Sequence, residues 1–357
     1  MSSSIADVRI LAIKELSAPA EVTRDLPTTP VATETVATAR RVLHDILRGG
    51  DGRLAVVVGP CSIHDPVAAL DYAERLAGVR RRLGHALAIV MRVYFEKPRT
   101  TVGWKGLIND PDLDGSFDIN RGLRLARKLL VDINGMGLPA GCEFLDTATP
   151  QYLADLVGWA AIGARTTESQ IHREMASGLS SPVGFKNGTD GDVRIAIDAV
   201  LSAAQPHHFL AVTKGGRAAI AATRGNEDCH VVLRGGRTPN FAAPHVDAAC
   251  RELTRSGLPP VVMIDASHAN SGKKPDNQLL VIENVAGQIA AGDRRIIGVM
   301  LESHLVGGSQ PLGSGRPLRY GQSITDGCLG WEETVIVLDR LAASVERRGK
   351  LGTAVGN

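Results

Sequence analysis

The chain has 357 residues, of which 44% are hydrophobic and 22% are charged, so wholesale disorder is excluded and a packed core is expected. Lysine and arginine number 40 against 38 acidic residues, and the net charge of +2 gives no global positive field for nucleic acid or an anionic membrane. Aromatic residues make up only 4%, which argues against stacking on single-stranded nucleic acid. Neither nucleic acid nor a membrane is therefore expected as a partner.

The cysteines and the N-terminus indicate a cytoplasmic protein. The five cysteines are an odd number with no CxxC pair, so they do not form a disulfide framework and favour a reducing compartment. The first residues lack the basic region and the long apolar core of a secretory signal. No apolar run approaches the roughly 20 residues that a membrane span requires.

Residues 1–50 are expected to form an N-terminal extension, in which prolines and threonines precede a helix at 34–47. After it, short apolar runs alternate with amphipathic stretches, a pattern typical of a parallel sheet covered by helices. A chain of this length could hold two domains, but eight such runs favour a single (β/α)8 TIM barrel of the α/β class. The expected strands are 54–59, 87–95, 139–144, 161–164, 182–185, 230–233, 261–264 and 296–301.

The helices between these strands are expected at 66–83, 120–131, 151–159, 193–204, 243–255 and 279–290. Two further runs near 207–223, joined by Lys214-Gly-Gly, predict a β-hairpin inserted between barrel units. The expected organisation is an extension at 1–50, a catalytic barrel at 51–345 and a C-terminal tail at 346–357.

Chemically competent residues stand at or just after the end of every expected strand. The carboxyl ends of all eight strands of such a barrel face one mouth, so these side chains are expected to converge there. A single charged residue after a strand is usually a solvated loop residue, but eight strands that end in this way favour a functional site. In chain order the residues are Cys61, Arg92, Glu143, Arg165, Lys186, Arg234, His268 and Glu302.

The cations among them predict a small, highly charged anion as the ligand. Arginine forks match carboxylate and phosphate groups, and lysines add compact point charges. So many positive charges would repel one another in an empty site. The segment Lys97-Pro98-Arg99-Thr100 adds a second anion cradle, so a pair of phosphates, or a phosphate and a carboxylate with a further phosphate, is expected.

A second group of residues predicts a metal site. One thiolate, one imidazole and two carboxylates suit one divalent ion such as Mn²⁺, Fe²⁺, Co²⁺ or Zn²⁺ better than Mg²⁺ or Ca²⁺. These side chains lie far apart in sequence, and only their expected place at the barrel mouth joins them. They are Cys61, His268, Glu302 and Asp326.

Seven motifs carry most of these residues. They are GPCSIHDP at 59–66, MRVYFEKPRTTVGWKG at 91–106, GARTTESQ at 163–170, PVGFKNGTDG at 182–191, LRGG at 233–236, DASHAN at 265–270 and GVMLES at 298–303. Together they resemble the class I (type Iα) 3-deoxy-D-arabino-heptulosonate 7-phosphate (DAHP) synthases. The resemblance runs from the N-terminal extension to Trp331, and motifs this long and numerous are highly specific.

The resemblance implies a metal-dependent condensation of phosphoenolpyruvate with erythrose 4-phosphate that releases phosphate, the first step of the shikimate pathway. It also implies the role of each site residue. The phosphoenolpyruvate contacts are Arg92, Lys97, Arg165, Lys186 and Arg234. The erythrose 4-phosphate contacts are Lys97, Pro98, Arg99 and Thr100. The metal ligands are Cys61, His268, Glu302 and Asp326. The catalytic residues are Lys97, Glu143 and Lys186, with Glu143 expected to orient or deprotonate the attacking water.

The resemblance further implies feedback inhibition by an aromatic amino acid, with help from the N-terminal extension, in a homodimer or homotetramer. The implied effector pocket consists of Gln151, Leu179, Ser180 and Phe209. A side chain at Ser180 crowds the para position of a bound ring, so phenylalanine is favoured as the effector over tyrosine or tryptophan.

Three alternatives stay open. A metal-dependent barrel hydrolase would also use a Cys, His and carboxylate site, but it has little need for five cations. An octulosonate 8-phosphate synthase performs the related condensation with arabinose 5-phosphate, whereas the segment at 97–100 favours the four-carbon aldose. A non-catalytic sensor of aromatic amino acids would be favoured by the loss of a ligand such as Cys61, and none is lost.

Overall fold

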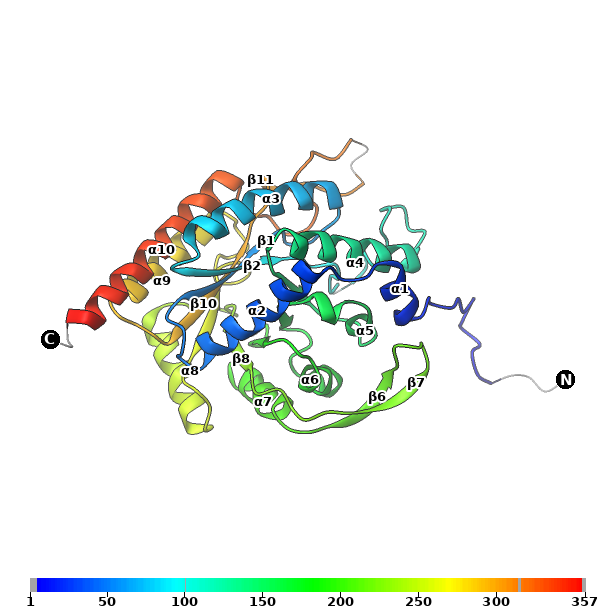
Figure 1. Cartoon of the computed structure of the whole chain (residues 1–357), viewed down its shortest axis with the longest axis horizontal. Helices are drawn as coiled ribbons and strands as arrows, with labels where there is room; N and C mark the ends of the chain where they lie inside the picture. The colour runs from blue at the N-terminus through cyan, green and yellow to red at the C-terminus, as the bar shows by residue number, and fades with distance from the viewer. Residues whose placement is uncertain (1–4, 100, 314–315, 355–357) are drawn as a thin grey trace.

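Eight parallel strands close into a barrel in the computed structural model, which describes residues 5–99, 101–313 and 316–354 (Figure 1). The order around the barrel is β1-β10-β9-β8-β5-β4-β3-β2. The predicted (β/α)8 barrel is therefore confirmed. The barrel strands are β1 (Leu54–Gly59), β2 (Leu87–Arg92), β3 (Ala140–Glu143), β4 (Trp159–Ile162), β5 (Val183–Lys186), β8 (Cys229–Leu233), β9 (Val262–Asp265) and β10 (Ile296–Glu302).

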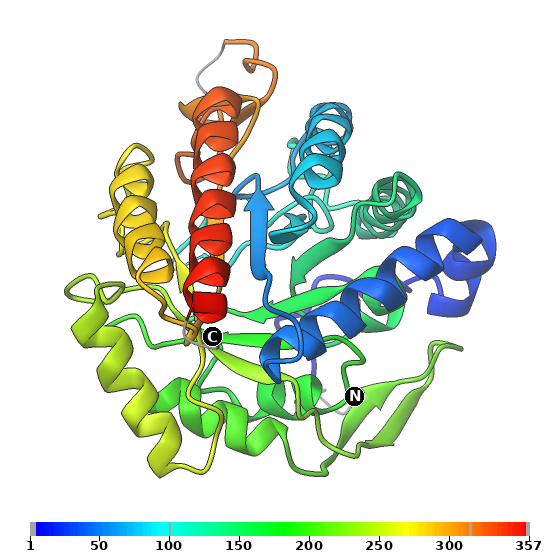
Figure 2. The ribbon, with the colours of Figure 1, turned by 60° about the vertical axis from the view of Figure 1, so that its left-hand side comes forward.

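Helices surround the strands as an outer ring (Figure 2). Proline at the first helical position and a preceding N-cap begin several of them: Asp65, for example, accepts hydrogen bonds from the amides of Val67 and Ala68 at the start of α3. The helices are α1 (Pro19–Asp25), α2 (Pro30–Leu47), α3 (Pro66–Leu83), α4 (Ile119–Gly135), α5 (Thr149–Leu153), the 3-10 helix η1 (Ala154–Leu156), α6 (Gln170–Ser177), α7 (Arg194–Ala203), α8 (Ala243–Arg255), α9 (Asn277–Ala290) and α10 (Trp331–Ala354).

One predicted helix, at 151–159, is wrong. The chain forms the short α5 there, continues as η1, and is already strand β4 at Trp159. Alanines and leucines fit a helix as well as a buried strand over so short a run, and the pairing of Trp159 with Gly141 of β3 decides the outcome. The second strand also ends earlier than predicted, at Arg92.

Within the part of the chain that the structure describes, two small sheets lie outside the barrel. The predicted hairpin is present as β6 (His208–Val212) and β7 (Ala218–Ala222), which pair antiparallel and project beside α6 in Figure 1. The second sheet, β11 (Val306–Ser309) with β12 (Gln322–Ser323), lies in the long loop after β10. The helix α10, which was not predicted, passes without a break through residue 346, where a separate tail was expected to begin.

The barrel interior is filled around Trp159. Alternate residues of each strand point inward, among them Ala55, Val57 and Val90, and form a core separate from the one between strands and helices. A Cβ at Gly184 would lie 2.6 Å from Cζ2 of Trp159, and one at Gly141 would lie 3.2 Å from its Cε3. The two glycines therefore leave the space that the indole ring occupies.

The helix α2 closes the N-terminal end of the barrel. Its apolar face, with Leu43, Ile46 and Leu47, joins the interior core around Trp159. At the same end the indole Nε1 donates to Nε2 of His230 at 3.2 Å, and the other ring nitrogen lies 3.2 Å from the carbonyl of Asp228. The ring is therefore held as the neutral tautomer with its proton on Nδ1. Burial lowers the pKa of His230 to about 4.

The N-terminal extension is fastened to the barrel from Glu15 onward, since the carbonyl of Glu15 accepts from Nδ2 of Asn120 at 3.1 Å. The amide of Ser17 donates to Oδ1 of Asn120, and the buried guanidinium of Arg127 binds the carbonyl of Leu26 and the carboxylate of Asp155. The preceding segment from Ile5 extends away from the barrel in Figure 1 and exposes most of its apolar side chains. Among the described residues, no helix combines the length and apolarity that crossing a membrane requires.

Candidate active site

A cavity of about 590 Å³ opens at the carboxyl ends of the barrel strands. Six lysines and arginines line it against two carboxylates, so its walls strongly favour anions. A volume of this size suits two small substrates. The charged lining residues are Lys97, Arg99, Glu143, Arg165, Lys186, Arg234, Lys273 and Asp326.

Lys186 and His268 are held in the cavity by one buried carboxylate, that of Asp265. Its Oδ2 lies 2.8 Å from Nζ of Lys186 and 2.8 Å from Nδ1 of His268, and its other oxygen accepts from the amide and hydroxyl of Ser267. Burial alone would raise the pKa of Asp265, but His268 and Lys186 lower it well below its usual value. The carboxylate therefore turns Nε2 of His268 toward the centre of the site.

Arg92 lies beneath the cavity and does not line it. Its guanidinium donates to the carbonyls of Pro60 and Cys61 and, at 3.0 Å, to Oε1 of Glu302. It also stacks 3.6 Å above the ring centre of Tyr94. A Cβ at Gly59 would lie 2.6 Å from the carbonyl oxygen of Arg92, so glycine is required for this close approach of β1 and β2.

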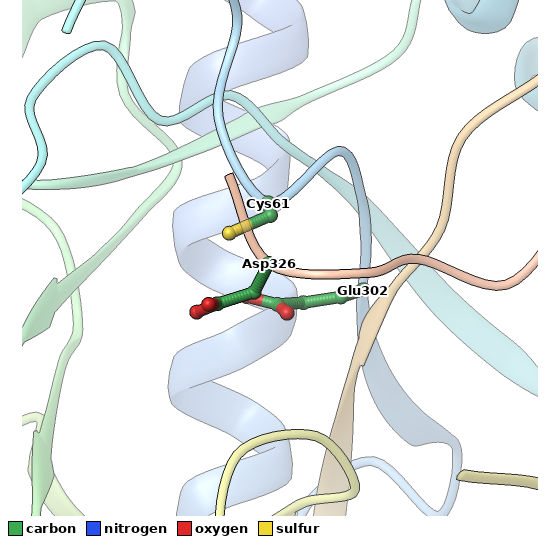
Figure 3. A group of neighbouring side chains, drawn as sticks. All are labelled: Cys61, Glu302 and Asp326. Carbon is green, nitrogen blue, oxygen red and sulfur yellow. The ribbon is translucent and has the colours of Figure 1, made fainter. Parts of the chain in front are cut away.

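Three of the four predicted metal ligands lie together. The ligand atoms of Cys61, Glu302 and Asp326 are all within 4.8 Å of one another (Figure 3). Cys61 follows β1, Glu302 ends β10, and Asp326 lies in the loop between β12 and α10. Nε2 of His268 is 3.8 Å from Oε1 of Glu302, at the edge of this group. Burial and the charge of Glu302 raise the pKa of the Cys61 thiol. A thiol, two carboxylates and an adjacent imidazole form a donor set that fits a divalent transition metal.

Lys97 connects this metal-type group to the cavity. Its Nζ donates to both the carbonyl and the sulfur of Cys61, at 3.2 Å each. Burial acts to lower the pKa of Lys97, but the negative charges of Cys61, Glu302 and Glu143 together outweigh it, and the pKa is raised. The ammonium therefore stays charged between the floor and the open cavity.

Glu143 enters the cavity from the end of β3. A Cβ at Gly163, at the end of the neighbouring strand β4, would lie 2.2 Å from Oε1 of Glu143. The carboxylate therefore occupies space that exists only because residue 163 has no side chain.

Three buried asparagines join the loops that carry the cations. The amide of Arg234 donates to Oδ1 of Asn187 at 2.8 Å, and Nδ2 of Asn240 donates to the same oxygen at 3.2 Å. The amide of Asn240 in turn donates to Oδ1 of Asn270, whose own Nδ2 binds the carbonyls of Leu233 and Asp265. Arg234, Lys186 and His268 thus stand on backbone segments that are cross-linked to one another.

The predicted site residues thus fall at two depths of one barrel end. Pro98 and Arg99 line the cavity, whereas Cys61, Arg92 and Glu302 form its floor. Thr100 lies outside the described residues. Sequence reasoning missed Asp265, the three asparagines and Lys273. Asp265 carried a usable signal, because an acidic residue ends a buried strand three positions before His268.

The residues predicted for the effector pocket lie away from this cavity, around α5, α6 and the hairpin. Gln151 belongs to α5, Leu179 and Ser180 follow α6, and Phe209 lies on β6. Nζ of Lys214 in the hairpin turn donates to the carbonyl of Gln151. The hairpin is therefore fastened to α5 at its turn.

Comparison with known proteins gives consistent findings. Residues 28–339 match the model of the DAHP synthetase I family. The chain is 62% identical over 342 residues to the phospho-2-dehydro-3-deoxyheptonate aldolase, Phe-sensitive, of Escherichia coli strain K12, covering 96% of this chain and 98% of that protein. It is 54% identical to the Trp-sensitive aldolase of Enterobacter agglomerans, with the same coverage.

A solved structure agrees with these sequence comparisons. The phospho-2-dehydro-3-deoxyheptonate aldolase from Francisella tularensis SCHU S4 superposes with a TM-score of 0.93 at 53% identity, covering 95% of this chain and 99% of that one.

Proposed function

The chain belongs to the DAHP synthetase I family and catalyses the condensation of phosphoenolpyruvate with erythrose 4-phosphate, and on this premise we propose which of its residues serve each part of the reaction. One observation supports the assignment most: six cations line a single cavity, and a cluster of Cys61, Glu302 and Asp326 lies at its base and wall. Two phosphate-bearing substrates account for the cations, and a divalent ion accounts for the cluster.

Phosphoenolpyruvate binds on the side of the cavity formed by β4, β5 and β8. Arg165, Lys186 and Arg234 receive its carboxylate and phosphate, with Arg92 acting from the floor. Because Asp265 fixes the ammonium of Lys186 and Asn187 fixes the backbone of Arg234 before the substrate arrives, little reorganisation of these two residues is required on binding.

Erythrose 4-phosphate binds at the segment Lys97 to Thr100. Lys97 lies between the two substrates, where its ammonium can orient the aldehyde of one against the methylene carbon of the other. Glu143 orients or deprotonates the water that adds to the adjacent carbon before the C–O bond to phosphate breaks. Catalysis by these residues is mainly positioning and electrostatic stabilisation.

The metal ligands are Cys61, His268, Glu302 and Asp326, and the ion is Mn²⁺, Fe²⁺, Co²⁺ or Zn²⁺. When bound, it supplies Lewis acidity toward the aldehyde. The chain prepares for it through Asp265, which directs Nε2 of His268 toward Glu302, and through Lys97, whose charge favours the thiolate of Cys61.

The assay that tests this assignment is phosphate release from phosphoenolpyruvate in the presence of erythrose 4-phosphate, with and without chelator. We expect release that depends on both substrates and stops when the metal is removed. Release without an aldose, or with arabinose 5-phosphate in preference to erythrose 4-phosphate, contradicts it.

Phenylalanine is the feedback inhibitor, and it binds at Gln151, Leu179, Ser180 and Phe209. The relatives named Phe-sensitive are more similar to the chain than those named Trp-sensitive, which supports this choice. Replacing Ser180 by Gly should raise the inhibition constant for phenylalanine a few-fold and admit tyrosine, because space opens at the para position. Inhibition titrations that show tyrosine or tryptophan as the sole effector of the natural protein exclude the assignment.

The enzyme is a homodimer or homotetramer that forms through the N-terminal segment and the hairpin. Both expose large apolar side chains: Leu11 and Ile13 in the segment, and Leu210 and Ile220, which face each other across the two hairpin strands. Exposed apolar patches of this kind mark protein interfaces. Light scattering on the natural protein should give a mass of two or four chains, and a monomer rejects the proposal.

A further inference from the structure

Lys273 lines the active-site cavity but belongs to no group described so far. It stands in the loop between β9 and α9, five residues after His268. Its backbone has a φ of +61°, the left-handed region that lysine rarely adopts, and His268 has a φ of +58° in the same loop. A bond from the amide of Lys273 to the carbonyl of His268, at 2.7 Å, holds this conformation. The loop thus fixes both side chains at the cavity.

Neighbouring cations of the cavity already have partners. Lys186 is paired with Asp265, Lys97 donates to Cys61, and Arg99 donates to the carbonyl of Trp104. Within the described part of the chain, the ammonium of Lys273 makes no hydrogen bond or ion pair. It therefore keeps its donors for a ligand.

The depth at which Lys273 lies in the cavity indicates which part of which substrate it can contact. Arg92 and Lys186 are buried at the base, whereas Lys273 and Arg99 are exposed at the rim. Lys273 and Asp326 line the same cavity, and both side chains are exposed to it. An aldose whose aldehyde lies at the buried Cys61 and Glu302 extends its phosphate, at the far end of its chain, toward this rim.

We propose that Lys273 is a second cationic contact for the phosphate of erythrose 4-phosphate, on the cavity wall formed by the β9–α9 loop. This inference rests on the function proposed above and adds a substrate-binding residue to it. Together with Arg99, it would select an aldose that carries a terminal phosphate over one that carries none.

The test replaces Lys273 by Gln, which removes the charge and keeps nearly the same length. We expect the KM for erythrose 4-phosphate to rise about tenfold, the loss typical of one charge-assisted hydrogen bond. The KM for phosphoenolpyruvate should stay within twofold, and Lys273→Arg should recover most of the loss. Binding of erythritol 4-phosphate, which keeps the phosphate and lacks the aldehyde, should weaken by the same factor in calorimetry.

Lys274 provides the matched control, since it is the next residue, is exposed and does not line the cavity. Lys274→Gln should leave both KM values unchanged. An unchanged KM for erythrose 4-phosphate in Lys273→Gln, or a rise in the KM for phosphoenolpyruvate instead, overturns the inference. If the unsubstituted enzyme releases no phosphate from the two substrates in the same assay, it is the proposed function that has failed.

Discussion

The two ends of the barrel are built on opposite principles. At the N-terminal end, α2 lays Leu43 and Ile46 against the interior core, and the polar pair there, Trp159 with His230, is neutral. At the carboxyl end, fixed charges crowd a cavity, and a buried ion pair of Arg92 with Glu302 forms its floor. One end stabilises the fold by burial, and the other concentrates charge that costs stability when unpaired.

The difference between the two ends predicts which substitutions should affect stability and which should affect turnover. Changes at the closed end should lower the free energy of unfolding and leave turnover alone. Changes at the open end should lower turnover, and they should lower the free energy of unfolding only where they leave a buried polar partner unpaired.

The largest effect is expected at the open end, from Cys61→Ala. Loss of the ligand removes several kcal/mol of transition-state stabilisation, so kcat should fall by at least about a thousandfold. The melting temperature in metal-free buffer should stay within a few degrees of the natural protein. If the variant keeps the kcat of the unsubstituted enzyme in metal-depleted buffer, the ligand assignment is wrong.

At the closed end, Leu43→Ala should reverse this pattern. Leu43 is buried against the interior core, so its truncation should lower the free energy of unfolding by about 2–5 kcal/mol in urea titrations. Both KM values and kcat should be unchanged at a temperature where the variant is folded. Val31→Ala, on the same helix but exposed, is the control and should change neither property. A fall in kcat for Leu43→Ala would show that the two ends are coupled.

Acid should lower the free energy of unfolding through His230, which lies at the N-terminal end of the barrel. Its pKa is about 4 in the folded chain against an ordinary value near 6.5, so between these values the unfolded chain takes up a proton that the folded chain refuses. The contribution of His230 to stability is therefore full above about pH 6.5, declines as the pH falls, and levels off below about pH 4, for a total of about 3 kcal/mol.

Urea titrations across this pH range measure the effect. His230→Gln can still accept from the indole Nε1 and does not titrate, so the difference in stability between the two proteins should change with pH by that amount. A difference that is constant from pH 7 to pH 4 contradicts the buried, neutral imidazole.

The smallest effect should come from Asn240→Ala, which removes a link between the loops of the open end. Arg234 and Lys186 keep their side chains but lose their fixed placement, so the KM for phosphoenolpyruvate should rise about tenfold. Its pair of bonds to Gly235 and Asn187 is buried, so a loss of about 1–2 kcal/mol of stability should accompany the change. An unchanged KM together with that loss would restrict the asparagines to a structural role.

Much of the fold was predictable, because apolar runs of a parallel barrel are continuous and are each followed by a helix. The bounds of α3 and α8 agree with prediction to the residue. The helix α10 and the short α1 and α6 were not predicted, and the segment at 151–159 was misassigned. In that segment the local sequence permits two structures, and contacts across strands choose between them.

The candidate site was likewise predictable in part. Sequence placed Lys186, Arg234 and Glu302 at one mouth, since strand polarity alone brings their positions together. It gave no sign that Arg92 and Glu302 pair beneath the cavity, or that Asp265 directs His268. Such pairings depend on register and side-chain direction, which periodicity does not report. The effector pocket followed from resemblance and not from any property of its residues.

The attachment of the N-terminal extension at Glu15 limits how far the segment before it can reach. The preceding segment from Ile5 to Lys14 can span at most about 35 Å when fully extended, a reach comparable with the width of a small domain. Because its base is fixed, the apolar side chains of the segment are confined to a small volume around the barrel, which raises their effective concentration there.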